Sequence, residues 1–177
     1  VLTKTPWAVL ALTVHIELFT QAHYRASIPA EADICELWRD VFLFHWKEES
    51  QHAMLDELEF RREDARLDDA QRDAAVGELI ELVGAVDGIL QAQAAADAEY
   101  FFAVATGRFN GAQREQIAAT FLKAYRWQYI VSGAMQPRFQ KVLFAMLSAE
   151  QAERVNNALA PLMSVAPAEG SPIVAMA

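Results

Sequence analysis

The sequence contains a single cysteine, few glycines and prolines, and no long uninterrupted apolar run. The lone Cys35 excludes a disulfide within the chain and fits a reducing compartment. Seven Gly and six Pro among 177 residues, more than half of them hydrophobic, argue against extensive disorder. Ionisable side chains such as Glu17 and Arg25 interrupt the apolar stretch at residues 6–28. It therefore lacks the ~20 clean apolar residues that a membrane span needs.

Positive charge is also scarce. Fifteen Lys and Arg residues face 24 Asp and Glu residues, which gives a formal net charge of −9. This balance argues against a surface that binds nucleic acid or anionic lipid. The sequence also shows no basic leader followed by an apolar segment, the pattern of a secretory signal. We therefore expect a soluble cytoplasmic protein, with one helical-bundle domain at residues 1–163 and a flexible tail at residues 164–177.

Apolar residues recur at steps of three and four along most of the chain, with no alternation typical of strands, so the expected fold class is all-α. Thr5 and Pro6 are suited to a helix start, and Ser148 with Gln151 forms a capping-box pattern. Pro137 should kink or divide the helix that contains it. The expected helices cover residues 6–27, 31–63, 70–105, 112–147 and a shorter segment from 148 to about 162.

The second expected helix carries a core strip that includes ionisable residues. Random Glu residues are disfavoured on such a strip. Glu49 and His52 both lie on it, whereas Glu48 should face solvent about 100° away. Cys35, near the start of this helix, is expected to be a small buried residue. The strip consists of Ile34, Trp38, Val41 or Phe42, His45, Glu49, His52 and Leu55.

Glu49-x-x-His52 places a carboxylate and an imidazole one turn apart on the same helical face, where both can reach one point. An oxygen donor beside a nitrogen donor suits a first-row transition metal such as iron or manganese. Glu17, midway along the apolar first helix, also needs a cation, hydrogen bonds or a raised pKa if it is buried. His45 is expected to be a core residue, or to orient a ligand through its ring nitrogen.

Glu on the first helix and Glu-x-x-His on the second resemble the ferritin-like superfamily of di-iron carboxylate bundles. The interval from position 17 to position 49 is close to the usual one, and the segment from Trp46 to His52 is similar to the desaturase motif. The resemblance implies an up-down four-helix bundle with a short additional C-terminal helix. It further implies that Glu17 binds one metal ion, that Glu49 bridges, and that His52 completes the ligand set. The implied protein is an iron-dependent oxidoreductase or oxygenase with one or two ions, iron or manganese, acting on an unknown small substrate.

The second half of the chain departs from that pattern. A full site needs a carboxylate on the third helix, for which Asp87 is the candidate and Asp97 the reserve. It also needs another Glu-x-x-His on the fourth helix, where the family spacing falls near Tyr125 and Gln128 instead. A symmetric di-iron centre is therefore not expected from this chain alone.

Two alternatives remain open from the sequence. In the first, Lys123 or Arg126 neutralises Glu17, Glu49 and Asp87, and the protein is a metal-free binding or scaffold bundle. In the second, the chain adopts a heme oxygenase-like helical fold. The expected partners are a small-molecule substrate or dioxygen, with a homodimer as the candidate assembly and with no nucleic acid or membrane.

Overall fold

The computed structural model describes residues 3–28 and 33–165, and all regular secondary structure within these ranges is helical. The all-α prediction is confirmed. No helix among these residues is both long enough and apolar enough to cross a membrane. The elements are α1 (Pro6–Ser27), α2 (Glu36–Asp64), α3 (Asp69–Val104), α4 (Gly111–Arg126), the π-helical turn η1 (Trp127–Val131), α5 (Ser132–Ala134), α6 (Pro137–Phe144), α7 (Ala149–Leu159) and the 3₁₀ helix η2 (Ala160–Val165).

Side-chain caps explain where several helices begin. The Thr5 side chain accepts a hydrogen bond from the Ala8 backbone, and Pro6 occupies the first turn of α1. Complete capping boxes open α3, α4 and α7, in which the first side chain and the Gln three positions later satisfy each other's backbone N–H groups. The expected box at Ser148 is confirmed. The residues that provide the caps of these three boxes are Asp68, Asn110 and Ser148.

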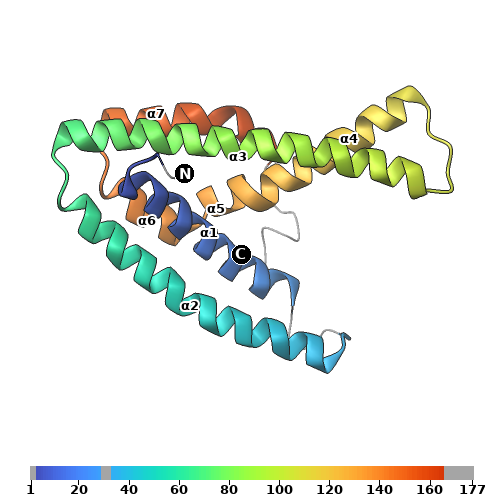
Figure 1. The fold of residues 1–177 in the computed structure, drawn as a ribbon, viewed down its shortest axis with the longest axis horizontal. Coiled ribbons are helices and arrows are strands. Elements are labelled where there is room, and N and C mark those ends of the chain that lie inside the picture. Colours follow the sequence, from blue (N-terminus) through green and yellow to red (C-terminus); the bar gives the residue numbers. More distant parts are fainter. Residues whose placement is uncertain (1–2, 29–32, 166–177) are drawn as a thin grey trace.

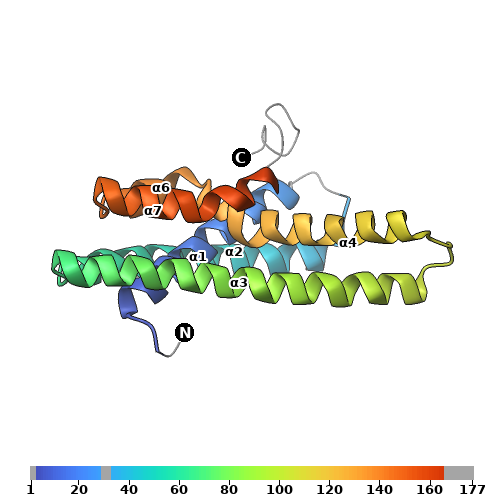
Figure 2. The same cartoon turned by 90° about the horizontal axis from the view of Figure 1, so that it is seen from above.

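Helix α1 lies in the middle of the molecule, with α2 on one side and α3 on the other (Figure 1). Helix α7 runs along α3, and α6 packs beside α1 (Figures 1 and 2). The far half of α3 and α4 form a hairpin that extends away from this body (Figure 1). The core is therefore centred on α1. Its large, fully buried side chains are Trp7, Val14, Phe60, Val76, Val131 and Val142.

Helix α2 differs from the expectation in its start and in its burial. It begins at Glu36 and not at residue 31; residues 33–35 are not helical, and residues 29–32 lie outside the described residues. Cys35 is exposed, contrary to expectation. Val41 and Leu55 were placed on the core strip but are 56% and 59% exposed. The reason is that α2 forms an outer layer that packs mainly on α1, so only one side of it can be covered (Figure 1).

The expected helix at residues 112–147 is broken into shorter elements. Helix α4 ends at Arg126, and η1 follows, where the Ser132 backbone N–H donates to the Trp127 carbonyl five residues earlier. As predicted, Pro137 divides the helix, and it is the first residue of α6. The π-helical turn was not predicted, because its sequence differs in no obvious way from that of an α-helix. Such turns often occur at functional sites.

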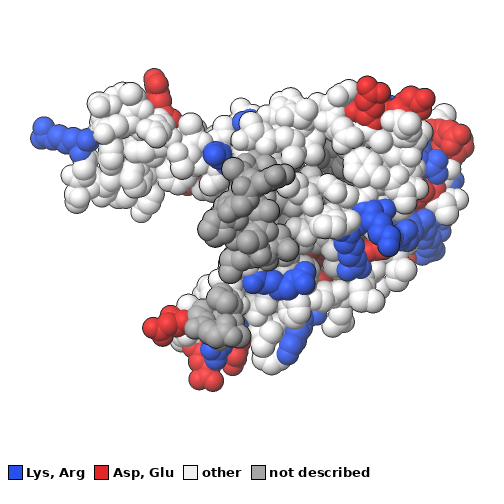
Figure 3. All heavy atoms as spheres, turned by 180° about the vertical axis from the view of Figure 1, so that it is seen from behind, with Lys and Arg blue, Asp and Glu red and all other residues white. Residues whose placement is uncertain are grey.

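The charged run after Leu58 is a solvated, ion-paired end of the molecule, as expected from the sequence. Charged side chains of both signs gather where α2 turns into α3, at the right of Figure 3. Three of these pairs join residues three or four positions apart, two on α2 and one across its end, and such a pair stabilises a helix by about a few tenths of a kcal/mol. The pairs at this end include Arg61–Glu57, Arg62–Glu59, Arg66–Glu63, Arg72–Asp64 and Arg138–Glu57.

The expected domain boundary falls inside η2. This 3₁₀ helix continues to Val165, which is buried, so packed chain extends past residue 163. The remaining part of the expected tail, residues 166–177, lies outside the described residues.

Candidate metal centre

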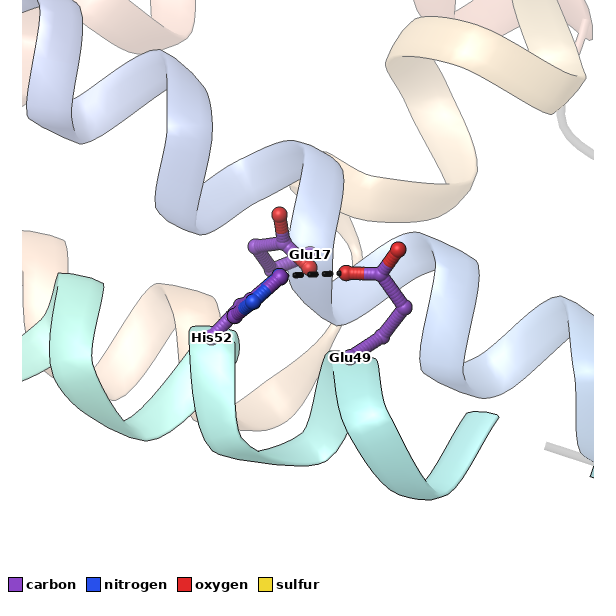
Figure 4. A group of neighbouring side chains, drawn as sticks. All are labelled: Glu17, Glu49 and His52. Carbon is purple, nitrogen blue, oxygen red and sulfur yellow. Dashed lines mark hydrogen bonds and ion pairs between the residues drawn. The ribbon is translucent and has the colours of Figure 1, made fainter. Parts of the chain in front are cut away.

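Three of the predicted site residues come together in the structure. Glu17 projects from α1, and Glu49 and His52 project from α2, so that the three side chains point toward one another (Figure 4). One ligand atom from each lies within 4.8 Å of the others. Glu17 therefore lies beside the Glu-x-x-His motif at the interface between α1 and α2.

The helical spacing accounts for the geometry within α2. Glu49 and His52 are one turn apart, and His52 Nδ1 lies 2.9 Å from Glu49 Oε2, the contact drawn in Figure 4. Nδ1 donates to the carboxylate when it carries a proton. The same nitrogen and oxygen are the atoms that a shared metal ion would bind.

Glu17 and Glu49 form a close pair of carboxyl groups. Burial, followed by the negative charge of Glu49 and hydrogen bonding to it, raises the pKa of Glu17 from 4.5 to about 7. The charge of Asp56 acts in the same direction, and His52 opposes it. A cation bound between Glu17 and Glu49 would oppose this shift, because both carboxyl groups could then be ionised together.

His52 is held in a strongly acidic setting. Its Nδ1 meets Glu49, and its Nε2 lies 3.1 Å from Glu48 Oε1. The hydrogen bond to Glu49, together with the charge of Glu48, raises the pKa of His52 above its ordinary value. The side chain is 46% exposed, so solvent or a small molecule can reach it.

Two further residues lie at this site. His45, expected to be a core residue or to orient a ligand, is exposed, and its Nε2 lies 3.2 Å from Glu49 Oε1. His45, Glu48 and Glu49 form a second group able to hold a cation. Glu48 was expected to be a solvated or salt-bridged residue, and it is exposed and pairs with His52. The signal that could have identified this second group is the i, i+4 spacing, which joins His45 to Glu49 and Glu48 to His52.

No Lys or Arg of the described residues forms an ion pair with Glu17 or Glu49. Lys123 is exposed. Two carboxyl groups and an imidazole facing one another without a permanent cation match the donor types that iron and manganese accept. The residues present therefore fit a bound transition-metal ion.

The structure does not bring Asp87 to the other three residues. Asp87 lies on α3, on the opposite side of α1 from α2, and Arg126 donates to its two carboxylate oxygens at 2.6 and 2.8 Å (Figure 1). These hydrogen bonds lower the pKa of Asp87, although burial opposes them. The reserve candidate Asp97 accepts a hydrogen bond from the Tyr125 hydroxyl.

Comparisons of the chain with protein-family models, with curated proteins and with solved structures find no match. The ferritin-like resemblance therefore stays a prediction that depends on Glu17, Glu49 and His52.

Proposed function

We propose that the protein is a ferritin-like metal-binding protein in which Glu17, Glu49 and His52 hold iron or manganese. We further propose that it is an iron-dependent oxidoreductase that uses dioxygen on a small substrate. Glu49, which contacts His52 and pairs with Glu17, serves as the shared ligand. Asp87 is not included in this ligand set, because Arg126 occupies its carboxylate.

The observation that supports this proposal best is the pairing of Glu17 with Glu49 without a Lys or Arg partner among the described residues. A close carboxyl pair in a partly buried position destabilises the fold unless one member is protonated or a cation neutralises both. His52 adds a nitrogen donor on the same side (Figure 4). The i, i+3 spacing holds two of the three donors ready without a change of backbone.

Bound iron would supply electron transfer to dioxygen at this site. The chain's own residues supply the remaining functions. Before the metal ion binds, Glu17, with its pKa near neutrality, can hold the proton that the metal ion must displace. His45, 3.2 Å from Glu49, orients the Glu49 carboxylate. The partial exposure of His52 leaves one side of the site open to small molecules.

The metal-free alternative accounts for one part of the structure only. Arg126 neutralises Asp87, as that alternative requires for the third helix. It does not explain Glu17 and Glu49, which have no Arg or Lys partner among residues 3–28 and 33–165. The metal-binding function is therefore the one that this geometry favours.

Metal binding can be measured directly. Protein produced in iron-supplemented cells is expected to retain about one or two metal equivalents, and the metal-free protein should bind Mn(II) in calorimetry. Glu49→Gln and His52→Ala should each weaken Mn(II) binding by about a hundredfold or more, because each removes a direct ligand. Loss of a residue that only supports a ligand already lowers metal affinity by about 10–100-fold. The same variants should lose Fe(II)-dependent oxygen uptake.

Glu59→Gln is the matched control, because Glu59 lies on the same helix but pairs with Arg62 on the exposed surface. It should bind Mn(II) as the wild type does. Circular dichroism should show the same helical content for all of these variants. Wild-type protein that binds no metal, or binding that is unchanged in Glu49→Gln, would refute the proposal.

A further inference from the structure

A pocket of about 550 Å³ lies directly beside the candidate metal centre. It is enclosed by α1, the first half of α2 and η1, and Glu49 and His45 form part of its wall. Its volume is within the range of small-molecule sites in proteins, roughly 300–1,000 Å³. A molecule in this pocket would therefore contact the carboxylate that is proposed to bind the metal.

Aromatic rings form much of the wall. The Tyr24 and Trp46 rings are stacked at 5.3 Å with an angle of 19° between their planes, and Trp38 packs on Phe42 at 4.2 Å. Rings arranged in this way favour a flat guest that can stack on a face or meet an edge. The aromatic lining residues are Phe19, Tyr24, Trp38, Phe42, Trp46 and Tyr129.

The charge of the lining limits the chemistry of the guest. No Lys or Arg belongs to the described lining, which does include Glu49. Negative charge on the guest is therefore disfavoured.

From these observations we infer that the pocket binds the substrate, and that the substrate is a neutral, planar, largely apolar molecule, such as a phenol or an aryl ketone. That the bound molecule is a substrate depends on the proposed metal function, whereas its binding to the pocket does not. Gln128 and Tyr129 bring the π-helical turn into the wall, so this turn shapes the side of the pocket opposite α2.

Calorimetry with metal-free protein can test the pocket independently of the metal. The probe 2-naphthol should bind at one site. Decahydro-2-naphthol, which has the same oxygen on a non-planar saturated skeleton, should bind at least about tenfold more weakly, as should the anion 2-naphthoate. Equal affinities for 2-naphthol and its saturated analogue would overturn the assignment of a planar guest. Tight binding of 2-naphthoate would overturn the assignment of a neutral one.

Variants of α2 locate the binding site. Phe42→Ala should weaken 2-naphthol binding about tenfold, whereas Phe44→Ala should leave it unchanged, because Phe44 is 65% exposed and outside the lining. Equal effects of Phe42→Ala and Phe44→Ala would place the probe elsewhere.

His52→Ala separates the two proposals. This variant should bind Mn(II) about a hundredfold more weakly or worse and still bind 2-naphthol, because His52 lies outside the pocket lining. Protein that binds 2-naphthol but no metal in the wild type would refute the proposed function and leave an aromatic-binding pocket. Protein that binds metal but no 2-naphthol would refute the pocket assignment and leave the metal centre.

Discussion

Gly133 is the position at which α5 comes closest to α1. A Cβ atom at this residue would lie 2.4 Å from His15 Nε2 and 2.8 Å from two ring carbons of the same side chain. His15 is buried, and its Nε2 donates to the Ile130 carbonyl of the π-helical turn at 2.9 Å. The absence of a side chain at Gly133 therefore allows the imidazole to link α1 to η1.

Gly133→Ala is expected to destabilise the protein by roughly 1–3 kcal/mol, because the new methyl group must displace a ring packed in the core. The measurement is urea unfolding followed by circular dichroism. Gly84→Ala is the matched control: it also lies inside a helix, but nothing lies within 4 Å of its added Cβ. It should stabilise by about 0.5–1 kcal/mol. Similar effects of the two variants would contradict the packing described for His15.

At the residue scale, the part of the site that depends on one helix could be predicted from sequence. The i, i+3 spacing determines that Glu49 and His52 share a face, and an apolar helix around Glu17 indicates that its carboxyl group needs a partner. Asp87 was the weaker inference, because its position relative to α2 depends on how α3 packs. An Asp on an apolar strip has the same pattern whether it meets a metal or an arginine, and here it meets Arg126.

At the scale of elements, α2 shows why a helix and its burial are separate predictions. The helix itself was expected from periodicity, yet only Ala53 and Phe60 of its described residues are buried. Apolar residues lie on more than one side of α2, so the sequence alone could not show which side meets α1. Exposed apolar surface of this kind often marks an interaction site, and the expected homodimer stays a prediction. The large exposed apolar residues of α2 are Leu37, Trp38, Val41, Phe42, Phe44, Met54, Leu55 and Leu58.

The hairpin of α3 and α4 is held at its tip by rings and not by a closed core. Helix α4 has no buried residue. Phe109, in the connecting loop, packs against Phe101 at 5.6 Å and Phe102 at 5.8 Å, and Phe101 also meets Phe121. A segment with little buried apolar contact opens at low free-energy cost. We therefore expect the hairpin to be the least stable part of the described fold.

Hydrogen exchange measured by mass spectrometry can check this expectation. Amides of residues 111–120 should exchange faster than those of residues 7–19, which lie in the core helix. Phe109→Ala should accelerate exchange in residues 111–120 by about tenfold, the equivalent of ~1.4 kcal/mol, without changing residues 7–19. Tyr100→Ala, at a 69% exposed position on α3, should have little effect. Uniform protection across both segments would show that the hairpin is not a separate unit.

At the scale of the whole molecule, the sequence predicts the kind of the elements better than their arrangement. Helical periodicity and caps depend on neighbouring residues, and these predictions are confirmed for α1, α3 and α7 apart from their exact ends. The layered arrangement, with α1 between α2 and α3, depends on which apolar faces meet. The break at η1 also depends on tertiary contacts such as that between His15 and the Ile130 carbonyl. The four-helix bundle of the ferritin-like type stays a prediction.

The Glu17–Glu49 pair makes the stability of the metal-free protein depend on pH. The pKa of Glu17 is raised from 4.5 to about 7 in the folded state, so between these values the folded chain binds more protons than the unfolded chain. The contribution of Glu17 to the free energy of unfolding must then fall as pH rises through this window, whereas His15 and His23, whose pKa values burial lowers, contribute in the opposite direction. His52 acts in the same direction as Glu17, because its pKa is also raised and its contribution is lost as pH rises through the folded value. The nearby titratable groups are Glu49, His52 and Asp56.

Urea unfolding of the metal-free protein between pH 4.5 and 7.5, with EDTA present, should show this decline in the difference between the wild type and Glu17→Gln, because both proteins contain His15 and His23. Glu17→Gln removes the titrating group, so its stability should fall less steeply than that of the wild type, and the variant should be the more stable protein at pH 7.5. Mn(II) should restore wild-type stability at pH 7.5 and have a smaller effect at pH 5, since a proton on Glu17 competes with the metal ion. Identical pH slopes for the two proteins would show that Glu17 is not the group that couples protons to folding. If Mn(II) stabilises both proteins equally, Glu17 is not a metal ligand.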